Sequence, residues 1–224
     1  MTKKIKVIEL FAGVGGFRLG LEGWKGKSAL SSYRKNKDSL YDFVWSNQRE
    51  PNCKKQYANL VYSRRFKKGI HNTELIDDVL EKENINKIDF DLLVAGFPCQ
   101  DYSVGTLLKN SKGLIGKKGV LWWSIYKLLQ SKKNKPNYLL FENVDRLLKS
   151  PADKKGRDFA VILKSLDELG YAVEWRVVNA GNYGMPQKRK RIFFIGYHKK
   201  SNFFKSLSKF GNEQWLVDNG TMFK

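Results

Sequence analysis

The sequence predicts an α/β fold, with a mostly parallel sheet and helices on both faces. Ile5 to Phe11 is a largely apolar, β-branched run, and Leu92 to Ala95 is continuously apolar rather than alternating, as is typical of a strand buried in a parallel sheet. The first run leads directly into a glycine-rich stretch and then a helical pattern. A strand, a glycine-rich turn and a helix in this order form the first unit of nucleotide-binding α/β folds.

The glycine-rich stretch runs from Ala12 to Phe17, AGVGGF, and precedes a helix that carries Leu19 and Leu21. Glycines allow the backbone to approach a ligand closely. The spacing departs from GxGxxG because Arg18 stands where the third glycine would be, and this disfavours a dinucleotide.

A second short strand, Phe43 to Ser46, is followed by a helix with Tyr57, Leu60 and Tyr62. In nucleotide-binding α/β folds, a carboxylate after the second strand accepts hydrogen bonds from ribose hydroxyls. Here the matching position is Gln48, with Glu50 two residues later, so the ribose contact stays open between them.

The strand Leu92 to Ala95 ends at Gly96 and Pro98, which puts Cys99 at its carboxyl end. Open α/β sheets place ligands and chemistry at this edge. Proline fixes φ and removes a donor, so it would hold the thiol at the start of a polar loop. We therefore predict that Cys99 is a nucleophile; the alternative is a small buried apolar residue.

The residues after Cys99 form a loop with glycines and several lysines, from Val104 to Gly119. So long a loop is uncommon unless it acts as a lid or binding loop, although a solvated loop is the alternative. A helix follows, with an apolar face of Trp122, Ile125, Leu128 and Leu129.

Asn137 to Val144, NYLLFENV, is predicted to be another strand buried on both faces, and it carries Glu142 near its end. A buried unpaired carboxylate costs several kcal/mol, so Glu142 is either catalytic or part of a structural ion pair.

The remaining elements are a helix closed by Gly170 and two strands. Between these strands lies the basic run QKRKR, where Arg189 and Arg191 fall on the same side of an extended chain; the alternative is a basic surface patch. The helix spans Phe159 to Leu169, and the strands span Tyr171 to Ala180 and Ile192 to Tyr197.

Composition narrows the class of protein. There are 42 Lys and Arg residues against 22 Asp and Glu, and the net charge of +20 favours a polyanionic partner, nucleic acid first. Two cysteines are too few for a disulfide framework, and no apolar run approaches the roughly 18–20 residues of a membrane span. Together with an amino terminus that lacks a signal-peptide profile, this predicts a cytoplasmic protein of one domain.

Four motifs in order resemble those of the bacterial C5-cytosine DNA methyltransferases. They are ELFAGVGGF from Glu9, GFPCQDYS from Gly96, Glu142-Asn143-Val144 and Gln187-Lys188-Arg189-Lys190-Arg191. The resemblance covers about residues 5 to 197. It implies a Rossmann-like S-adenosylmethionine-dependent methyltransferase fold, with the catalytic and cofactor-binding domain at 1–197 and an aromatic, basic tail at 198–224 that could dock on a partner.

The resemblance also implies roles for individual residues. The acidic segment 71–78 would contact the adenine through either Asp78 or Glu74, although both could be ordinary residues of a first helical turn. The implied catalytic residues are Cys99, Glu142, Arg189 and Arg191. The implied cofactor-binding residues are Phe11, Ala12, Gly13, Gly15, Gly16, Phe17, Asn47, Gln48, Glu50, Asp78, Phe97, Pro98 and Leu121. The implied substrate-binding residues are Pro98, Gln100, Ser103, Asn143, Val144 and Gln187, and no metal is expected.

The implied reaction is methyl transfer from S-adenosylmethionine to C5 of a cytosine flipped out of double-stranded DNA, in a restriction-modification context. Family members normally continue into a target-recognition region and then a Gly-Asn-Ser segment, and neither is found here. We therefore expect a split enzyme whose second subunit carries these parts, or a truncated product. The alternatives are a transfer-RNA cytosine-5 methyltransferase and an inactive DNA-binding paralogue.

Overall fold

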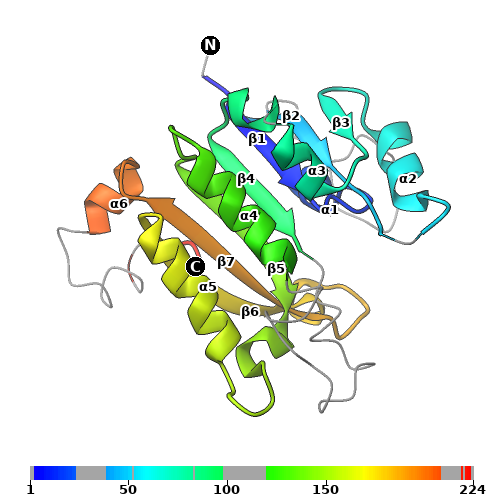
Figure 1. Ribbon diagram of the computed structural model, residues 1–224. Coiled ribbons are helices and arrows are strands. Elements are labelled where there is room, and N and C mark those ends of the chain that lie inside the picture. The colour runs from blue at the N-terminus through cyan, green and yellow to red at the C-terminus, as the bar shows by residue number, and fades with distance from the viewer. Residues whose placement is uncertain are drawn as a thin grey trace. The chain divides into compact units, whose positions relative to one another are not determined.

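The computed structural model describes residues 3–23, 39–51, 53–82, 84–97, 120–207, 218 and 220–222. The chain forms two compact units, residues 1–96 and residues 97–224. Each unit has its own strands and helices, shown in Figure 1.

The first unit contains a four-stranded parallel sheet in the order β3-β2-β1-β4. Strand β1 therefore lies between β2 and β4, as Figure 1 shows. The elements in chain order are β1 (Ile5–Leu10), α1 (Gly16–Glu22), β2 (Tyr41–Asn47), α2 (Tyr57–Arg65), β3 (Ile70–Asn72), α3 (Ile76–Glu81), η1 (Asn84–Lys87) and β4 (Leu92–Gly96).

Strands β1 and β4 of this sheet are buried along most of their length. Val7, Ile8 and Leu10 in β1 have no exposed surface, and neither do Leu93 and Val94 in β4. The apolar residues that predicted these two strands therefore lie in the core of the first unit. Because parallel strands share one carboxyl edge, the segments after β1, β2 and β3 leave the sheet on the same side.

The second unit is built on three antiparallel strands, with β7 between β5 and β6. Helix α5 packs on β6, where Phe159 meets Trp175 edge to face with ring centroids 5.4 Å apart. The elements are α4 (Val120–Ser131), β5 (Tyr138–Val144), η4 (Asp145–Lys149), α5 (Arg157–Glu168), β6 (Tyr171–Asn179), η5 (Ala180–Tyr183), β7 (Lys190–His198) and α6 (Asn202–Leu207).

An aromatic cluster forms the core of the second unit. Phe97, Trp122, Phe141 and Phe194 meet at tilted or edge-to-face angles, with centroid distances between 5.4 and 6.4 Å. Such pairs add to the stabilisation that comes from area burial alone. The cluster joins α4 to β5 and β7.

The predicted strands and helices are confirmed in the described residues, with two differences. Strand β5 alternates between buried and half-buried residues, so the prediction that both its faces are buried is wrong. The basic run also enters a strand earlier than predicted, because β7 begins at Lys190 and pairs Arg191 with Val144 of β5. In the part of the chain that the structure describes, no helix combines the length and apolar character needed to cross a membrane.

Two neighbouring glycines differ in what they allow. Gly15 has φ +87°, and a Cβ built there would lie 2.2 Å from Phe66 Cε2, whereas Gly16 has no described atom within 4 Å of its Cβ position. We predict that Gly15→Ala lowers the free energy of unfolding by about 2 kcal/mol, because a left-handed backbone penalises a side chain. Gly16→Ala, the matched control, should change it by less than about 0.5 kcal/mol. Urea unfolding measures both, and equal effects would contradict the prediction.

Candidate functional site

A turn with left-handed backbone connects β1 to α1, and we call residues 11–15 the glycine turn. Phe11 and Gly13 both have φ 54°, and Gly15 has φ 87°. Phe11 is the only non-glycine residue with a positive φ in the described part of the chain. Strained backbone of this kind persists only where its surroundings fix it, and it often marks a functional site.

Two bonds from the end of β2 hold the glycine turn in place. The backbone N–H of Gly13 donates to Gln48 Oε1 at 2.7 Å, and the N–H of Ala12 donates to the Asn47 carbonyl at 3.0 Å. The Gln48 amide oxygen therefore acts on the turn, while the carboxyl of Glu50 is exposed. Of the two residues considered for the ribose contact, Glu50 is the better candidate.

Asn47 has a structural role in this part of the first unit. Its side chain is 1% exposed, and Nδ2 donates to Asn72 Oδ1 at 3.0 Å and to the Glu74 carbonyl at 2.9 Å. This fixes the segment after β3, and the contact of Asn47 with a cofactor stays a prediction.

The two candidates for the adenine contact lie in different surroundings. Glu74 forms an exposed ion pair with Lys82. Asp78 lies exposed in the first turn of α3, one turn along the chain from Glu74. Because the Glu74 carboxylate already has a partner, Asp78 is the better candidate for a ligand.

In the second unit, Glu142 and Arg191 form an ion pair across β5 and β7, with Arg191 Nε 2.9 Å from Glu142 Oε1. Arg191 lies opposite Val144, two residues from Glu142, so the pair is a diagonal contact on one face of the sheet. Arg191 Nη1 also donates to the Lys190 carbonyl at 2.7 Å, which fixes the guanidinium.

Glu142 takes up a proton more readily than an ordinary glutamate. Burial raises the pKa of Glu142, and the charges of Arg191 and Arg189 oppose this without cancelling it. Burial thus favours the neutral form of the Glu142 carboxyl more than in water, and the ion pair with Arg191 fixes its position. A carboxyl that holds its proton more strongly than usual can donate a hydrogen bond to a ligand.

Asn143 connects the strand of Glu142 to the segment that leads to Cys99. Its Nδ2 donates to the Phe97 carbonyl at 3.3 Å, its Oδ1 accepts from the Val144 N–H at 2.8 Å, and the side chain is 1% exposed. The bond to Phe97 ties strand β5 to the residue before Pro98, and the substrate contact of Asn143 stays a prediction.

The other predicted residues of the second unit divide by exposure. The Phe97 ring is 4% exposed within the aromatic cluster, and Leu121 is partly exposed on α4. Val144 is half-buried, whereas Gln187 and Arg189 lie exposed in the loop between η5 and β7. Pro98, Cys99, Gln100 and Ser103 lie outside the described residues.

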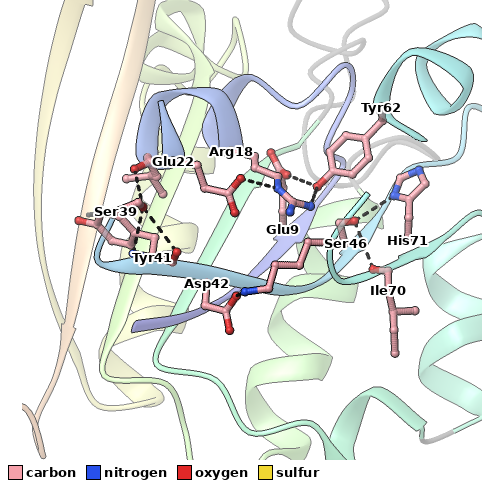
Figure 2. A network of polar contacts seen from close by, with 12 residues as sticks. Glu9, Arg18, Glu22, Ser39, Tyr41, Asp42, Ser46, Tyr62, Ile70 and His71 are labelled. Carbon is pink, nitrogen blue, oxygen red and sulfur yellow. Dashed lines mark hydrogen bonds and ion pairs between the residues drawn. The ribbon is translucent and has the colours of Figure 1, made fainter. Parts of the chain in front are cut away.

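A polar network in the first unit was not predicted from the sequence (Figure 2). Glu9 has no exposed surface, and Tyr62 donates a hydrogen bond to its Oε2 at 2.9 Å. Burial raises the pKa of Glu9 to about 7, against the Tyr62 hydroxyl and Arg18, which lower it. A glutamate inside the apolar run IKVIELF was the available signal, because a buried carboxyl must find donors.

A family model described as C-5 cytosine-specific DNA methylase matches residues 5–219. The chain is 49% identical over 217 residues to the Type II methyltransferase M.Sau3AI of Staphylococcus aureus. It is 33% identical over 201 residues to the Type II methyltransferase M.HaeII of Haemophilus aegyptius. These alignments cover 97% and 90% of this chain, but only 49% and 53% of the relatives. The chain thus spans about half the length of these relatives.

Solved structures of low sequence identity show the same fold. The S. pombe Dnmt2 methyltransferase matches with a TM-score of 0.59 at 19% identity, over 89% of this chain and 51% of that one. The Entamoeba histolytica methyltransferase EhMeth matches with a TM-score of 0.58 at 22% identity, over 88% and 53%. The predicted methyltransferase fold is confirmed.

The ion pair makes a direct prediction about protonation. In Arg191→Gln the positive charge that favours the carboxylate is lost, so the pKa of Glu142 should rise further above its usual range. Carbon-detected NMR titration of the glutamate side chains measures this pKa. Arg176→Gln is the control, since Arg176 lies on β6 and bonds the Met222 carbonyl. An unchanged or lowered pKa in Arg191→Gln would contradict the account.

Proposed function

The chain belongs to the C-5 cytosine-specific DNA methylase family, and on that premise we propose that it transfers a methyl group from S-adenosylmethionine to C5 of cytosine in DNA. The observation that carries the proposal is the Glu142 carboxyl, which has a raised pKa and is held by Arg191 at the end of a strand. The nucleophile is Cys99, by the resemblance of its GFPCQDYS motif, which is one of four motifs that stand in the family's order.

The reaction needs a nucleophile because C5 of an aromatic cytosine attacks a methyl sulfonium poorly. The Cys99 thiolate adds to C6, and the electron pair of the C5–C6 bond becomes available at C5. C5 then forms a bond to the methyl group while the methyl–sulfur bond breaks and its electron pair stays on sulfur. A base removes the C5 proton, the C5–C6 double bond re-forms, and the thiolate leaves.

In this scheme, Glu142 prevents negative charge from accumulating on the ring. Its protonated carboxyl donates to ring N3 and accepts from the 4-amino group as the thiolate adds. A raised pKa suits this role because the carboxyl must carry a proton at working pH. Arg191 keeps the carboxyl in position, and it would hold the base O2 through the part of its guanidinium that does not face Glu142.

The glycine turn fits the cofactor that this reaction needs. Gly13 and Gly16 have no described atom within 4 Å of their Cβ positions, so a ligand can approach the backbone there. When bound, S-adenosylmethionine supplies the electrophilic methyl group. The turn residues Phe11, Ala12, Gly13, Gly15, Gly16 and Phe17 would bind it, with Glu50 at the ribose, Asp78 at the adenine and Leu121 beside it.

Double-stranded DNA is the proposed substrate. The segment from the end of η5 to the start of β7 exposes apolar and basic side chains suited to bases and phosphates: Tyr183, Met185, Lys188, Arg189 and Lys190. C5 and C6 are inaccessible in a stacked duplex, so the cytosine must be flipped out at a cost of a few kcal/mol. Pro98, Gln100, Ser103, Val144 and Gln187 would line the site that receives it.

We further propose that the reaction belongs to a restriction-modification system in the cytoplasm and that a second chain supplies target recognition. Two relatives named Type II methyltransferases support the first point. For the second point, the four motifs resemble those of the family's catalytic part, and the match covers 49% and 53% of the two relatives.

The proposal is tested by transfer of labelled methyl groups from S-adenosylmethionine to mixed-sequence DNA. We expect Cys99→Ser to abolish transfer while cofactor binding, measured by calorimetry, is retained. Cys53→Ser is the matched control and should keep the activity, because Cys53 lies in the first unit and its thiol donates only to the Lys55 carbonyl among the described residues. Transfer that survives in Cys99→Ser would refute the assignment.

The second chain is tested in the same assay. If the chain transfers no methyl group alone, the product of a neighbouring gene should restore transfer. A folded wild-type chain that transfers methyl groups alone to a defined sequence would refute the need for a second chain, and not the chemistry.

A further inference from the structure

The Tyr62 hydroxyl bonds side chains from both flanks of the glycine turn. Glu9 lies in β1, two residues before the turn, and Arg18 lies in α1, three residues after it. The Tyr62 hydroxyl donates to Glu9 Oε2 at 2.9 Å and accepts from Arg18 Nη1 at 3.4 Å. Figure 2 shows these three side chains converging at this oxygen. The contact closes a ring through strand, turn and helix.

This contact is isolated from water. Glu9, Arg18 and Tyr62 are 0%, 3% and 1% exposed, and Glu9 Oε1 has no hydrogen-bond partner among the described residues. Water therefore cannot easily replace a bond lost here, and the partner left behind would stay buried and unsatisfied. Each bond in the ring matters more than a comparable bond at the surface.

The Tyr62 hydroxyl has a fixed position because its ring is packed on both sides. The ring stacks on His71 with centroids 4.3 Å apart and meets Phe66 at 4.9 Å. Phe66 in turn lies against Gly15, and the Arg18 guanidinium carbon lies 4.7 Å from the centre of the Phe66 ring. Tyr62 of helix α2 and Phe66, which follows the helix, thus pack against the glycine turn and its flanking residues.

We infer that Tyr62 is a positioning residue for cofactor binding, because its hydroxyl fixes the spacing between β1 and α1 and thereby the left-handed backbone of the glycine turn. It acts through Glu9 and Arg18, on the backbone that the cofactor would contact. The inference rests on the proposed function, which places S-adenosylmethionine at this turn. A turn already held in its binding conformation does not have to be ordered when the ligand binds, and this increases affinity.

The test compares Tyr62→Phe with Tyr57→Phe in the full chain. Tyr57 lies on the same helix and is 63% exposed, so it is a matched control. Calorimetry with S-adenosylmethionine should show a dissociation constant about tenfold higher in Tyr62→Phe and within about twofold of wild type in Tyr57→Phe. The amide resonances of Gly13 and Gly15 should shift only in Tyr62→Phe. General loosening of α2 would not move these two resonances selectively.

A second pair of variants tests the positioning role of Tyr62 if Tyr62→Phe does not fold. Glu9→Gln keeps an oxygen that accepts from the Tyr62 hydroxyl, so it should weaken cofactor binding less than Glu9→Leu does. Equal affinity in Glu9→Gln and Glu9→Leu, or wild-type affinity in a folded Tyr62→Phe, would overturn the inference. If the wild-type chain itself fails to bind S-adenosylmethionine, the proposed function fails at the cofactor, and the positioning role fails with it.

Discussion

A carboxyl group that a strand shields from water must find hydrogen-bond donors, and Glu9, Glu142 and Glu174 meet this need in different ways among the described residues. Glu9 in β1 accepts from Tyr62 of α2. Glu142 in β5 pairs with Arg191 of β7. Glu174 in β6 accepts from the Tyr197 hydroxyl and from the N–H groups of Thr221 and Met222. In each case the donor comes from another element, so satisfying the carboxyl ties together parts of the chain distant in sequence.

The carboxyl groups differ in what surrounds them, and this separates their roles. Glu174 is buried and accepts several donors, as a structural carboxylate does. Glu142 is half-buried and pairs with Arg191, and burial raises its pKa against the charges of Arg191 and Arg189, as suits the proton-donating role proposed for it. Glu9 is fully buried behind the glycine turn, so its influence on a ligand passes through the backbone.

Local patterns in the sequence were sufficient to predict most of the strands and helices. The runs around Ile8 and Leu93 predict buried parallel strands because most of their residues are apolar and do not alternate with polar ones. The glycines after β1 predict a turn because few other residues adopt a left-handed backbone. The antiparallel order of β5, β7 and β6 could not be predicted in this way, because strand order depends on contacts between distant segments.

For the candidate site, the sequence identified individual residues but not the contacts between them. Glu142 and Arg191 were identified by motif, but their ion pair follows from the register of β5 with β7, which the sequence does not state. The side chains of Asn47 and Asn143 are buried and bonded to backbone of distant segments, and no local pattern in the sequence predicts those bonds. The link from Tyr62 to Glu9 spans 53 residues and has no local signal.

The most direct test of the account is the covalent bond between Cys99 and the base. A fluorine at C5 of the target cytosine cannot leave as a cation, so the thiolate stays attached to C6 after methyl transfer. The active chain, with its partner if one is needed, is incubated with S-adenosylmethionine and DNA containing 5-fluorocytosine, digested, and mapped by mass spectrometry. The account predicts one adduct, on the peptide that contains Cys99. Methylation of normal DNA without an adduct on the fluorinated DNA, or an adduct on another residue, would contradict it.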